Sequence, residues 1–426
     1  MKKLLIISPH FPPINGADMH RVRQSLPYYR EFGWEPTVVA VHPEYVEGAQ
    51  DPLLEKSLPE GLRVIRVKAF STKYTRKLGL GSLALRSLFF YWRTVNRLLK
   101  KERFDLVFFS TTQFPVLVLG NYWKRRFGVP YVIDMQDPWH TDYYLSKPKS
   151  ERPPKYWFAY RINKWLEPIA MRRVGALMSV SEAYLITLQE RYSNIRPEMC
   201  HTITFGAFEK DFELVAAPAV ARATAGADEH IHIVYVGRAG HDMKKAFRAL
   251  FGGFRMGLEQ GLEAFKNMRF HFIGTSYAAD GKGIKTVEPL AEEAGVLKYV
   301  EEQTDRVPYF SGLQLLREAD LLVVPGSEDP QYTASKLYPY ILAKKPLLAI
   351  FHERSSVVEV LQQTRAGECA TFSAETPTEE LSRQVFEKLR QLAAKLPFVP
   401  DTNWEAFRPY TARERARLQV GVFNQY

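Results

Sequence analysis

The sequence lacks the features of several protein classes, beginning with cysteine and long hydrophobic runs. Only two of its 426 residues are cysteines, Cys200 and Cys369, and neither belongs to a Cys-x-x-Cys or Cys/His pattern. A disulfide framework and a zinc site are therefore not expected. Four consecutive apolar residues precede Ser8 and Pro9, which is too few for a signal peptide. No run approaches the roughly 18 apolar residues of a spanning helix, so we expect a cytoplasmic protein.

Two nucleotide-binding fingerprints are also missing. The chain contains no Gly-x-Gly-x-x-Gly segment after a strand and no Walker-type Gly-Lys-Ser/Thr segment. Their absence disfavours a dinucleotide-dependent oxidoreductase and a P-loop nucleoside triphosphatase.

Acidic residues are scarce between Gly61 and Phe104, where 12 lysines and arginines stand against one acid, Glu102. The formal net charge of the whole chain is +11, which favours an anionic partner. Nucleic acid, nucleotide phosphates and an anionic membrane surface all fit this charge.

Residues 81–101 predict an amphipathic helix within this basic region. Such a helix suits either a membrane surface or a core on which it packs with its basic side in solvent. We expect one apolar face, with Leu85, Leu88, Phe89, Trp92, Val95 and Leu99, and one basic face, with Arg86, Arg93, Arg97 and Lys100.

The rest of the chain alternates between strands and helices. Short apolar runs that end in turn residues predict buried parallel strands, and helical stretches separate them. This alternation predicts an α/β protein with two doubly wound, Rossmann-like domains. The predicted strands are KLLIISP, EPTVVAV, LRVIRV, DLVFFS, PYVIDM and ALMSVS in the first half, and HIVYVG, RFHFIG, KYVEEQ, LLVVPG and PLLAIF in the second.

An Ala/Pro/Gly-rich segment without periodicity, residues 214–228, predicts the linker between the two domains. We assign residues 1–213 to the first domain, 229–403 to the second, and 404–426 to a C-terminal helical tail. Ligands of open α/β sheets bind beyond the carboxyl ends of the strands, so the loops after the strands are the candidate sites.

Two loops of the first domain carry candidate residues. Gly16 follows the first strand and allows backbone N–H groups to approach an anion, although a plain turn explains it equally well. The segment PYVIDMQDPWH ends a strand with Gln136, Asp137, Trp139 and His140. Polar groups beside an indole ring suit sugar recognition. The two acids of this segment, Asp134 and Asp137, also suggest a glycosidase pair.

Two loops of the second domain carry cations. Gly237 and Arg238 follow a strand, and Lys244 opens a helix, where a cation is unfavourable unless an anion binds as well. A phosphate site explains this placement, and a solvated basic helix start is the alternative.

A later loop adds hydroxyl groups and a lysine. Thr333 and Ser335 are good helix caps, and Lys336 falls in the first turn of the predicted helix. Together these groups form a cradle for a diphosphate, unless Ser335 simply caps its helix.

The order of these motifs resembles that of the retaining glycosyltransferases of the GT-B fold, specifically family 4. The resemblance covers nearly the whole chain and rests on SPHFPPING, PYVIDMQDPW, ALMSVSEAYLITLQERY, YVGRAGHDMKKAF and SKLYPYILAKKPLLAI. It implies two domains facing a cleft, with a C-terminal helix that crosses back to the first domain. It also implies a nucleotide-sugar donor, such as a UDP- or GDP-sugar, in the second domain and a glycan or lipid-linked acceptor in the first.

The resemblance further implies that no metal, cofactor or nucleic acid takes part. It assigns catalysis to Asp137, His140, Arg238 and Lys244, and acceptor binding to Gln136, Asp137, Trp139 and His140. Donor binding falls to Gly16, Gly237, Arg238, Lys244, Glu328, Asp329, Thr333, Ser335 and Lys336.

Two residues depart from the family pattern. Gln136 stands where the family often has histidine, and Pro339 stands where an acid grips the donor ribose; Glu328 or Asp329 is expected to replace that acid. Three hypotheses remain. The protein is a glycosyltransferase in which another residue contacts the donor ribose, a nucleotide-sugar 2-epimerase of the same fold, or a non-catalytic nucleotide-sugar-binding protein. For the transferase we expect a cytoplasmic enzyme, with residues 81–101 at the inner face of a membrane.

Overall fold

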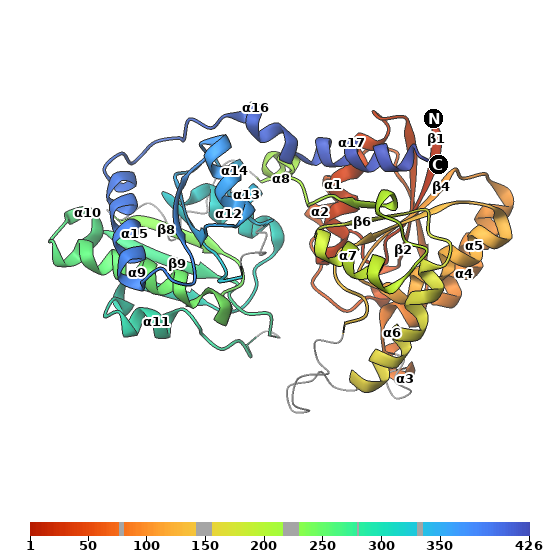
Figure 1. Cartoon of the computed structure of the whole chain (residues 1–426), viewed down its shortest axis with the longest axis horizontal. Coiled ribbons are helices and arrows are strands. Elements are labelled where there is room, and N and C mark those ends of the chain that lie inside the picture. Colours follow the sequence, from red (N-terminus) through yellow and green to blue (C-terminus); the bar gives the residue numbers. More distant parts are fainter. Residues whose placement is uncertain (76–80, 142–155, 216–229, 279–280, 330–334) are drawn as a thin grey trace. The chain divides into compact units, whose positions relative to one another are not determined.

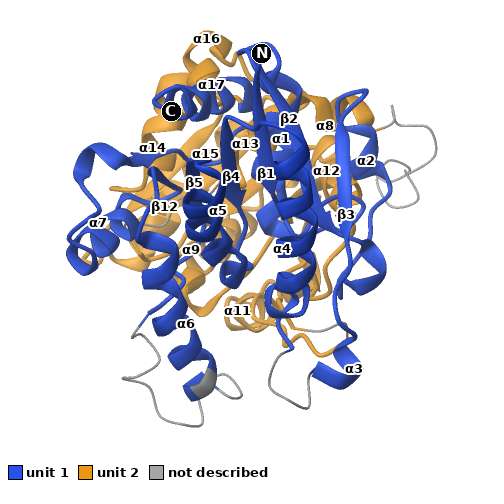
Figure 2. Ribbon diagram, turned by 90° about the vertical axis from the view of Figure 1, so that its right-hand side faces the viewer, with its two compact units in different colours: residues 1–206, 412–426 blue, residues 207–411 orange. Residues whose placement is uncertain are grey.

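The computed structural model describes residues 1–75, 81–141, 156–215, 230–278, 281–329 and 335–426. The chain forms two compact α/β units, which Figure 2 colours separately. Unit 1 comprises Met1–Gly206 and Ala412–Tyr426, and unit 2 comprises Ala207–Thr411.

The unit boundaries differ from the sequence assignment, which placed them at residues 213 and 404. Residues 207–213 belong to unit 2 because Tyr309 donates a hydrogen bond of 2.7 Å to Asp211. The end of unit 2 lies beside its beginning, since the backbone N–H of Ala207 donates to the Tyr410 carbonyl at 2.8 Å. Residues 216–228 of the expected linker lie outside the described residues.

Unit 1 is built on a seven-stranded parallel sheet with the order β3-β2-β1-β4-β5-β6-β7. The order reverses between β1 and β4, which makes the sheet doubly wound. Six of the strands were predicted, and the short β7 was not. The strands are β1 (Lys2–Ile7), β2 (Trp34–Val41), β3 (Arg63–Val67), β4 (Leu106–Ser110), β5 (Tyr131–Met135), β6 (Ala176–Ser179) and β7 (Cys200–Thr202).

Alternate strand residues of unit 1 enter two different apolar cores. Leu5 and Ile7 join the core beneath α4, α5 and α6, whereas Leu4 and Ile6 join the core beneath α1 and α17. Both faces of the sheet are therefore covered, as its continuous apolar strands require. The helices of unit 1 are α1 (His20–Tyr29), α2 (Leu53–Lys56), α3 (Thr72–Thr75), α4 (Leu83–Lys101), α5 (Val118–Phe127), α6 (Tyr156–Met171), α7 (Glu182–Arg191) and α17 (Ala412–Phe423), with the 3₁₀ turns η1 (Ala17–Met19), η2 (Pro43–Tyr45), η4 (Phe114–Leu117) and η7 (Pro197–Met199).

The C-terminal helix α17 packs on unit 1, beside α1 (Figure 1). Its Phe423 ring lies 5.0 Å from the Phe108 ring and 5.7 Å from the Trp34 ring. The buried Gln419 accepts a hydrogen bond from Tyr29 at 2.5 Å and donates one to Ser25 at 3.0 Å. The predicted return of the chain to the first domain is thus confirmed, for residues 412–426.

Unit 2 repeats the architecture with six parallel strands in the order β10-β9-β8-β11-β12-β13. The order reverses between β8 and β11, so this sheet is doubly wound as well. Its strands are β8 (Ile231–Val236), β9 (Met268–Ile273), β10 (Val300–Gln303), β11 (Leu321–Pro325), β12 (Leu347–His352) and β13 (Glu368–Phe372).

The helices of unit 2 cover both faces of this sheet. The two longest, α9 and α15, pack directly against each other. The helices are α8 (Glu209–Leu214), α9 (Lys244–Glu259), α10 (Glu263–Lys266), α11 (Glu288–Glu293), α12 (Tyr309–Glu318), α13 (Leu337–Leu342), α14 (Ser356–Thr364), α15 (Thr378–Ala393) and α16 (Trp404–Phe407), with η8 (His241–Met243), η9 (Leu297–Tyr299) and η10 (Arg408–Tyr410).

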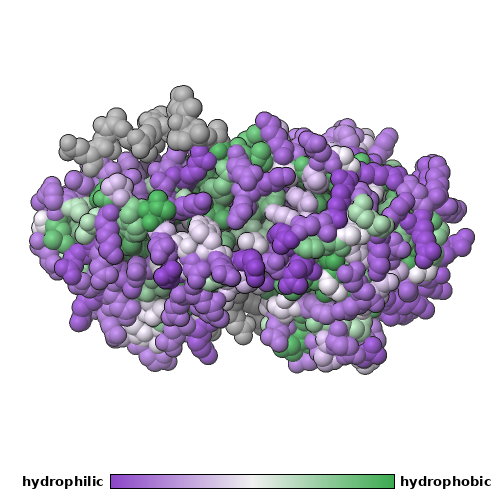
Figure 3. Space-filling model, turned by 90° about the horizontal axis from the view of Figure 1, so that it is seen from above, coloured by the Kyte–Doolittle hydropathy of each residue, from purple (hydrophilic) through white to green (hydrophobic). Residues whose placement is uncertain are grey.

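The surface seen in Figure 3 is mostly hydrophilic, with hydrophobic side chains in patches among the polar ones. Within the described part of the chain, no helix is both long enough and apolar enough to cross a bilayer.

Helix α4 presents a different face to the core than the sequence predicted. Its buried residues include Leu83, Tyr91, Val95 and Leu98. Arg86, expected on the basic face, is buried and donates to the carbonyls of Phe70 at 2.7 Å and Tyr45 at 2.9 Å. The expected apolar face instead leaves two large rings in solvent, since Phe89 is 47% exposed and Trp92 is 39% exposed.

Candidate functional site

Unit 1 gathers polar residues at the point where its strand order reverses. The loop after β1 and the turn η1 meet the loop after β4 there. Asp18 accepts hydrogen bonds from the Thr111 hydroxyl at 2.7 Å and from the Thr112 backbone N–H at 3.0 Å. A switch point at the carboxyl ends of parallel strands is where open α/β sheets bind their ligands.

A histidine–aspartate pair lies at this switch point. The other carboxylate oxygen of Asp18 is 2.8 Å from Nδ1 of His10. Burial alone raises the pKa of Asp18, but its bonds with His10, Thr111 and Thr112 outweigh burial and lower it below the usual value. Asp18 is therefore ionised.

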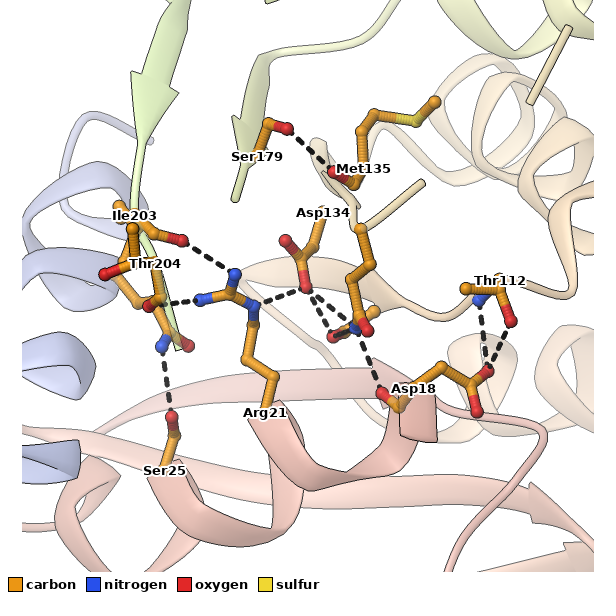
Figure 4. A network of polar contacts seen from close by, with 12 residues as sticks. Asp18, Arg21, Ser25, Thr112, Asp134, Met135, Ser179, Ile203 and Thr204 are labelled. Carbon is orange, nitrogen blue, oxygen red and sulfur yellow. Dashed lines mark hydrogen bonds and ion pairs between the residues drawn. The ribbon is translucent and has the colours of Figure 1, made fainter. Parts of the chain in front are cut away.

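A buried network continues from this pair along the sheet edge (Figure 4). The guanidinium of Arg21 lies between the carboxylate of Asp134, at 2.7 Å from Nε, and the carbonyl of Ile203, at 2.7 Å. Burial raises the pKa of Asp134, although the charge of Arg21 and the Ser110 hydrogen bond oppose the rise. This network fixes α1 against β4, β5 and the chain after β7.

Gly16 lies between the two members of the pair. A Cβ on Gly16 would come within 3.0 Å of Cβ of His10 and 3.1 Å of a carboxylate oxygen of Asp18. Its backbone is extended, with φ −101°. The glycine therefore leaves space for the pair, and no positive φ requires it.

Gln136 is buried beside this network instead of facing solvent. Its amide nitrogen lies 3.0 Å from the Asp18 carbonyl, 3.0 Å from the Ser110 hydroxyl and 3.1 Å from Asp134. The amide donor is thereby engaged inside the protein.

The remaining predicted acceptor residues divide between surface and core. Asp137 is exposed at the surface, yet desolvation by the surrounding protein and, next, the charge of Asp18 raise its pKa. Trp139 is buried, with its ring stacked on Phe114 at 5.6 Å and its indole N–H donated to Asn163. The expectation that its ring face receives a sugar is therefore corrected.

His140 is also buried, and its main chain is held between two charged side chains. Its N–H donates to Glu167 at 3.1 Å, and its carbonyl accepts from Arg191 at 3.2 Å. Its ring packs on Tyr160 at 4.7 Å. His140 is therefore packed inside unit 1, and its catalytic assignment stays a prediction.

Unit 2 brings three of the predicted donor residues together at its own switch point. Gly237 has φ +153° directly after β8, a conformation that favours glycine. A Cβ at this position would lie 3.2 Å from Nζ of Lys336. Lys336 precedes α13 and donates to the hydroxyl of Tyr235, whose own hydroxyl donates to the Arg238 carbonyl at 2.6 Å.

Arg238 is held by an acid that the sequence analysis did not select. Its guanidinium makes a two-pronged ion pair with Asp242, at 2.7 and 2.8 Å. The hydrogen bond from Arg238 lowers the pKa of Asp242 to about 2. An i, i+4 arginine–aspartate pair after a strand was a signal available in the sequence.

Lys336 is partly covered, and its charge is disfavoured. Burial and, next, the positive charge of Arg238 lower its pKa to about 7. Its ammonium lies 4.8 Å from the centre of the Tyr235 ring. An anion bound beside Arg238 and Lys336 would relieve this repulsion between the two cations.

The other predicted donor residues make no recorded side-chain contact with Arg238 or Lys336 among the described residues. Lys244 begins α9, as expected. The backbone N–H of Glu328 donates to the Asp242 carbonyl at 2.8 Å, and that of Asp329 donates to Ser327 at 3.1 Å; both side chains are exposed. Thr333 lies outside the described residues.

Ser335 does not cap the helix that follows it. Helix α13 begins at Leu337 with Lys336 at the cap position, and no side chain bonds to its first turn. The prediction of a Ser335 cap is therefore wrong. Pro339 falls within the first turn, where the missing N–H costs no intrahelical bond.

Comparison with known protein families gives a match that lies in unit 1. Residues 20–206, which lie within unit 1, match the family model described as glycosyl transferase 4-like domain. No curated protein sequence matches the chain.

Solved structures share the fold over the whole chain. HepE of Anabaena, in complex with UDP-glucose, is 15% identical with a TM-score of 0.60, covering 100% of both chains. Sucrose-phosphate synthase of Thermosynechococcus elongatus is 14% identical with a TM-score of 0.54, again over 100% of both chains. UDP-GlcNAc 2-epimerase of Methanocaldococcus jannaschii is 11% identical with a TM-score of 0.52 over 100% of both chains. The predicted resemblance is thus borne out by the family model over residues 20–206 and, for the fold alone, by these structures over the full length.

Proposed function

We propose that the chain is a glycosyltransferase that moves a sugar from a nucleotide-sugar to a glycan or lipid-linked acceptor. The observation that carries this proposal is the cation pair of unit 2, in which Arg238 and Lys336 meet at the switch point after β8. Placed positive charge stabilises a departing diphosphate without reorganisation during the reaction. The glycosyl transferase 4-like domain of unit 1 and the UDP-glucose complex of the similar HepE structure support the same function.

Retention of configuration and independence of metal are part of the proposal. Both follow from the resemblance to family 4, in which cationic side chains neutralise the diphosphate.

A hollow in unit 1, lined in part by polar side chains, supports a glycan acceptor. It has a volume of about 420 Å³ and lies between the η2 turn and the start of α3. Carboxylates and hydroxyls accept and donate the hydrogen bonds that sugar hydroxyls make. Its lining residues are Glu44, Tyr45, Val46, Glu47, Ser71, Thr72 and Arg86.

We also propose that unit 1 contacts an anionic membrane from the cytoplasmic side. Phe89 stacks on Trp92 at 6.0 Å, and Phe70 lies 6.4 Å from Phe89, so exposed rings form one cluster. Basic side chains accompany them on α4, where Arg93, Arg97, Lys100 and Lys101 are exposed. Aromatic rings with cations on one helix suit the headgroup region of a bilayer.

Binding of nucleoside diphosphates tests the donor site. Lys336→Ala and Arg238→Ala are each expected to weaken UDP or GDP binding by about tenfold or more, because each removes a charge-assisted contact worth roughly 1.5–3 kcal/mol. Binding of uridine or guanosine should change little. Calorimetry that shows equal losses for nucleoside and diphosphate would contradict the cradle, and a wild-type protein that binds neither diphosphate would contradict the function.

A 2-epimerase is the second candidate, supported by the full-length similarity of fold to UDP-GlcNAc 2-epimerase. The two activities separate in one experiment. Incubation with UDP-N-acetylglucosamine and no acceptor yields the 2-epimer if the chain is an epimerase. A transferase yields no 2-epimer and needs an acceptor, or water, to release UDP.

A further inference from the structure

Helix α6 of unit 1 carries two tryptophans on its solvent side. Trp157 is 64% exposed and Trp165 is 69% exposed. Removal of an indole ring from water is favourable, and tryptophan side chains are on average largely buried in folded proteins. Two such rings exposed on one helix therefore indicate a binding surface.

A cation lies between the two rings. Trp157, Arg161 and Trp165 follow one another at intervals of four residues, which places them in one row along the helix. The guanidinium carbon of Arg161 lies 5.6 Å from the centre of the Trp157 ring. Lys164, one residue before Trp165, is exposed like Arg161. We call Trp157, Arg161, Lys164 and Trp165 the α6 surface.

The surroundings of the α6 surface are positively charged. Glu167 is the one acid in the sequence of α6, and its side chain is 1% exposed and paired with Arg191. Helix α5, which packs against α6, has no acid in its sequence, and its Arg125 and Arg126 are exposed. This balance of charge favours an anionic partner.

The alternation of rings and cations distinguishes between anionic partners. If both rings entered the acyl region of a bilayer, the guanidinium between them would lose water without gaining an acceptor, which is costly. An acidic polysaccharide offers both kinds of group in turn. The C–H groups of a sugar ring pack on the negative face of an indole, and its carboxylate or sulfate accepts hydrogen bonds from a guanidinium.

The spacing of the rings sets a minimum length for this ligand. At 1.5 Å per residue, eight residues separate Trp157 from Trp165 by about 12 Å along the helix axis. A ligand that contacts both rings is therefore longer than one sugar.

We propose that the α6 surface binds a segment of an acidic polysaccharide. Sugar rings stack on Trp157 and Trp165, and an anionic group between them pairs with Arg161. A polynucleotide also offers rings and anions, and the choice of a glycan rests on the proposed function, in which unit 1 takes a glycan acceptor. The surface lies wholly within unit 1, and it extends the proposed function by naming the charge of the glycan.

Fluorescence anisotropy of a labelled oligogalacturonate tests the proposal in the full-length protein, without any nucleotide-sugar. At physiological salt the wild-type protein should bind this probe, and it should not bind a neutral maltooligosaccharide of equal length. Trp157→Ser and Trp165→Ser should each weaken binding by about tenfold or more, because tryptophans are the side chains that most often dominate binding energy. Both substitutions keep the net charge of +11, so general attraction of a polyanion does not explain such a loss.

Further variants serve as controls. Arg161→Gln should also weaken binding and make the remaining affinity less sensitive to salt, because it removes an ion contact that salt screens. It keeps the test available if a tryptophan variant is unstable in thermal unfolding. Trp92→Ser, at an exposed ring of α4, and Tyr277→Ser, at an exposed ring of unit 2, should bind the probe as the wild type does. A heparin oligosaccharide that competes with the probe supports the proposal with sulfate as the anion.

Three outcomes would overturn the proposal. The first is that the wild-type protein does not bind oligogalacturonate, and the second is that both tryptophan variants bind it as tightly as the wild type. The third is that these variants lose binding of labelled poly(U) or of phosphatidylserine vesicles but keep that of oligogalacturonate, which identifies a polynucleotide or a membrane as the partner.

The proposed function is decided by a separate measurement. No donor is present in the polysaccharide experiment, so its result does not depend on sugar transfer. Binding of UDP or GDP by the wild type, and its loss in Lys336→Ala, can fail while oligogalacturonate binding succeeds, and the reverse holds as well.

Discussion

Asp242 competes with the ligand expected at Arg238. The two carboxylate oxygens of Asp242 occupy both donors of one guanidinium edge, which are the donors a phosphate would use. A diphosphate must therefore share or replace this partner. The ion pair with Asp242 restrains Arg238 before the donor binds. The free energy needed to break this pair lowers the affinity for the diphosphate.

Asp242→Asn is expected to tighten UDP binding by about two- to fivefold. Partly exposed ion pairs of this kind are worth up to about 1 kcal/mol, which limits the gain. Calorimetry with UDP measures it, and Glu293→Gln, which neutralises an acid paired with Arg248 on the same unit, controls for net charge. Weaker binding by Asp242→Asn would mean that Asp242 positions Arg238 and does not compete.

Lys336 should take up a proton when the diphosphate binds. With a pKa of about 7, lowered from 10.5, it is largely neutral at pH 8 in the free protein, and a bound anion favours its charged form. UDP affinity should therefore fall as pH rises above about 7. Calorimetry at pH 8 in buffers of different ionisation enthalpy should detect close to one proton per UDP in wild type, and none in Lys336→Arg.

The lowered pKa of Lys336 also makes the stability of the folded protein depend on pH. Between about pH 7 and 10.5 the unfolded chain keeps a proton that the folded Lys336 has released, so this residue's contribution to stability increases with pH across that window.

Single residues show where sequence reasoning succeeds and where it ends. Gly237, Arg238 and Lys336 were selected because each follows or precedes an element, and the fold brings them together. The His10–Asp18 pair was missed because seven residues lie between its members, although a histidine after the first strand and an acid at the next helical turn were visible. Trp139 was placed on the surface because sequence order does not reveal which ring packs on Phe114.

At the scale of elements, α13 carries the departure from the family pattern. Pro339→Glu should leave stability within about 1 kcal/mol of wild type, since an acid in the first turn of a helix is favourable by about 0.3–1 kcal/mol. It should tighten UDP binding by about tenfold if its carboxylate reaches the ribose. Pro339→Gln, similar in size but uncharged, is the control for calorimetry and thermal unfolding.

Two loop variants complete this comparison. Glu328→Ala and Asp329→Ala show whether the loop after β11 already contacts the ribose. Tenfold weaker binding by Pro339→Glu, with neither loop variant affected, would contradict both the ribose role of position 339 and its replacement by the loop.

The strands were easier to predict than the faces of the helices. Runs such as LLVVPG are apolar on both sheet faces, so their burial follows from composition alone. The strands β7 and β13 were missed because CHT is very short and ECATF is only partly apolar. On α4 the apolar periodicity fitted more than one face, and the carbonyls that bind Arg86 come from distant parts of the chain.

At the scale of the whole molecule, exposed rings and charges predict membrane binding. The protein should sediment with vesicles that contain phosphatidylserine, more at low salt than at physiological salt, because salt screens surface charge. Trp92→Ser should weaken this binding, whereas Tyr277→Ser, at a more exposed aromatic side chain in unit 2, should not. Absence of sedimentation at low salt would contradict the proposal, since screening is weakest there.

The return of α17 to unit 1 has a consequence for biosynthesis. The helix is made about 300 residues after β4, yet it covers the core formed by Tyr29, Trp34 and Phe108. At roughly 5–20 residues per second, that core stays uncovered on the ribosome for roughly 15–60 s. During this time the newborn chain presents an apolar sheet face that chaperones recognise. Closure of unit 1 therefore waits until α17 has been made, and a chain that terminates before residue 412 keeps an open core.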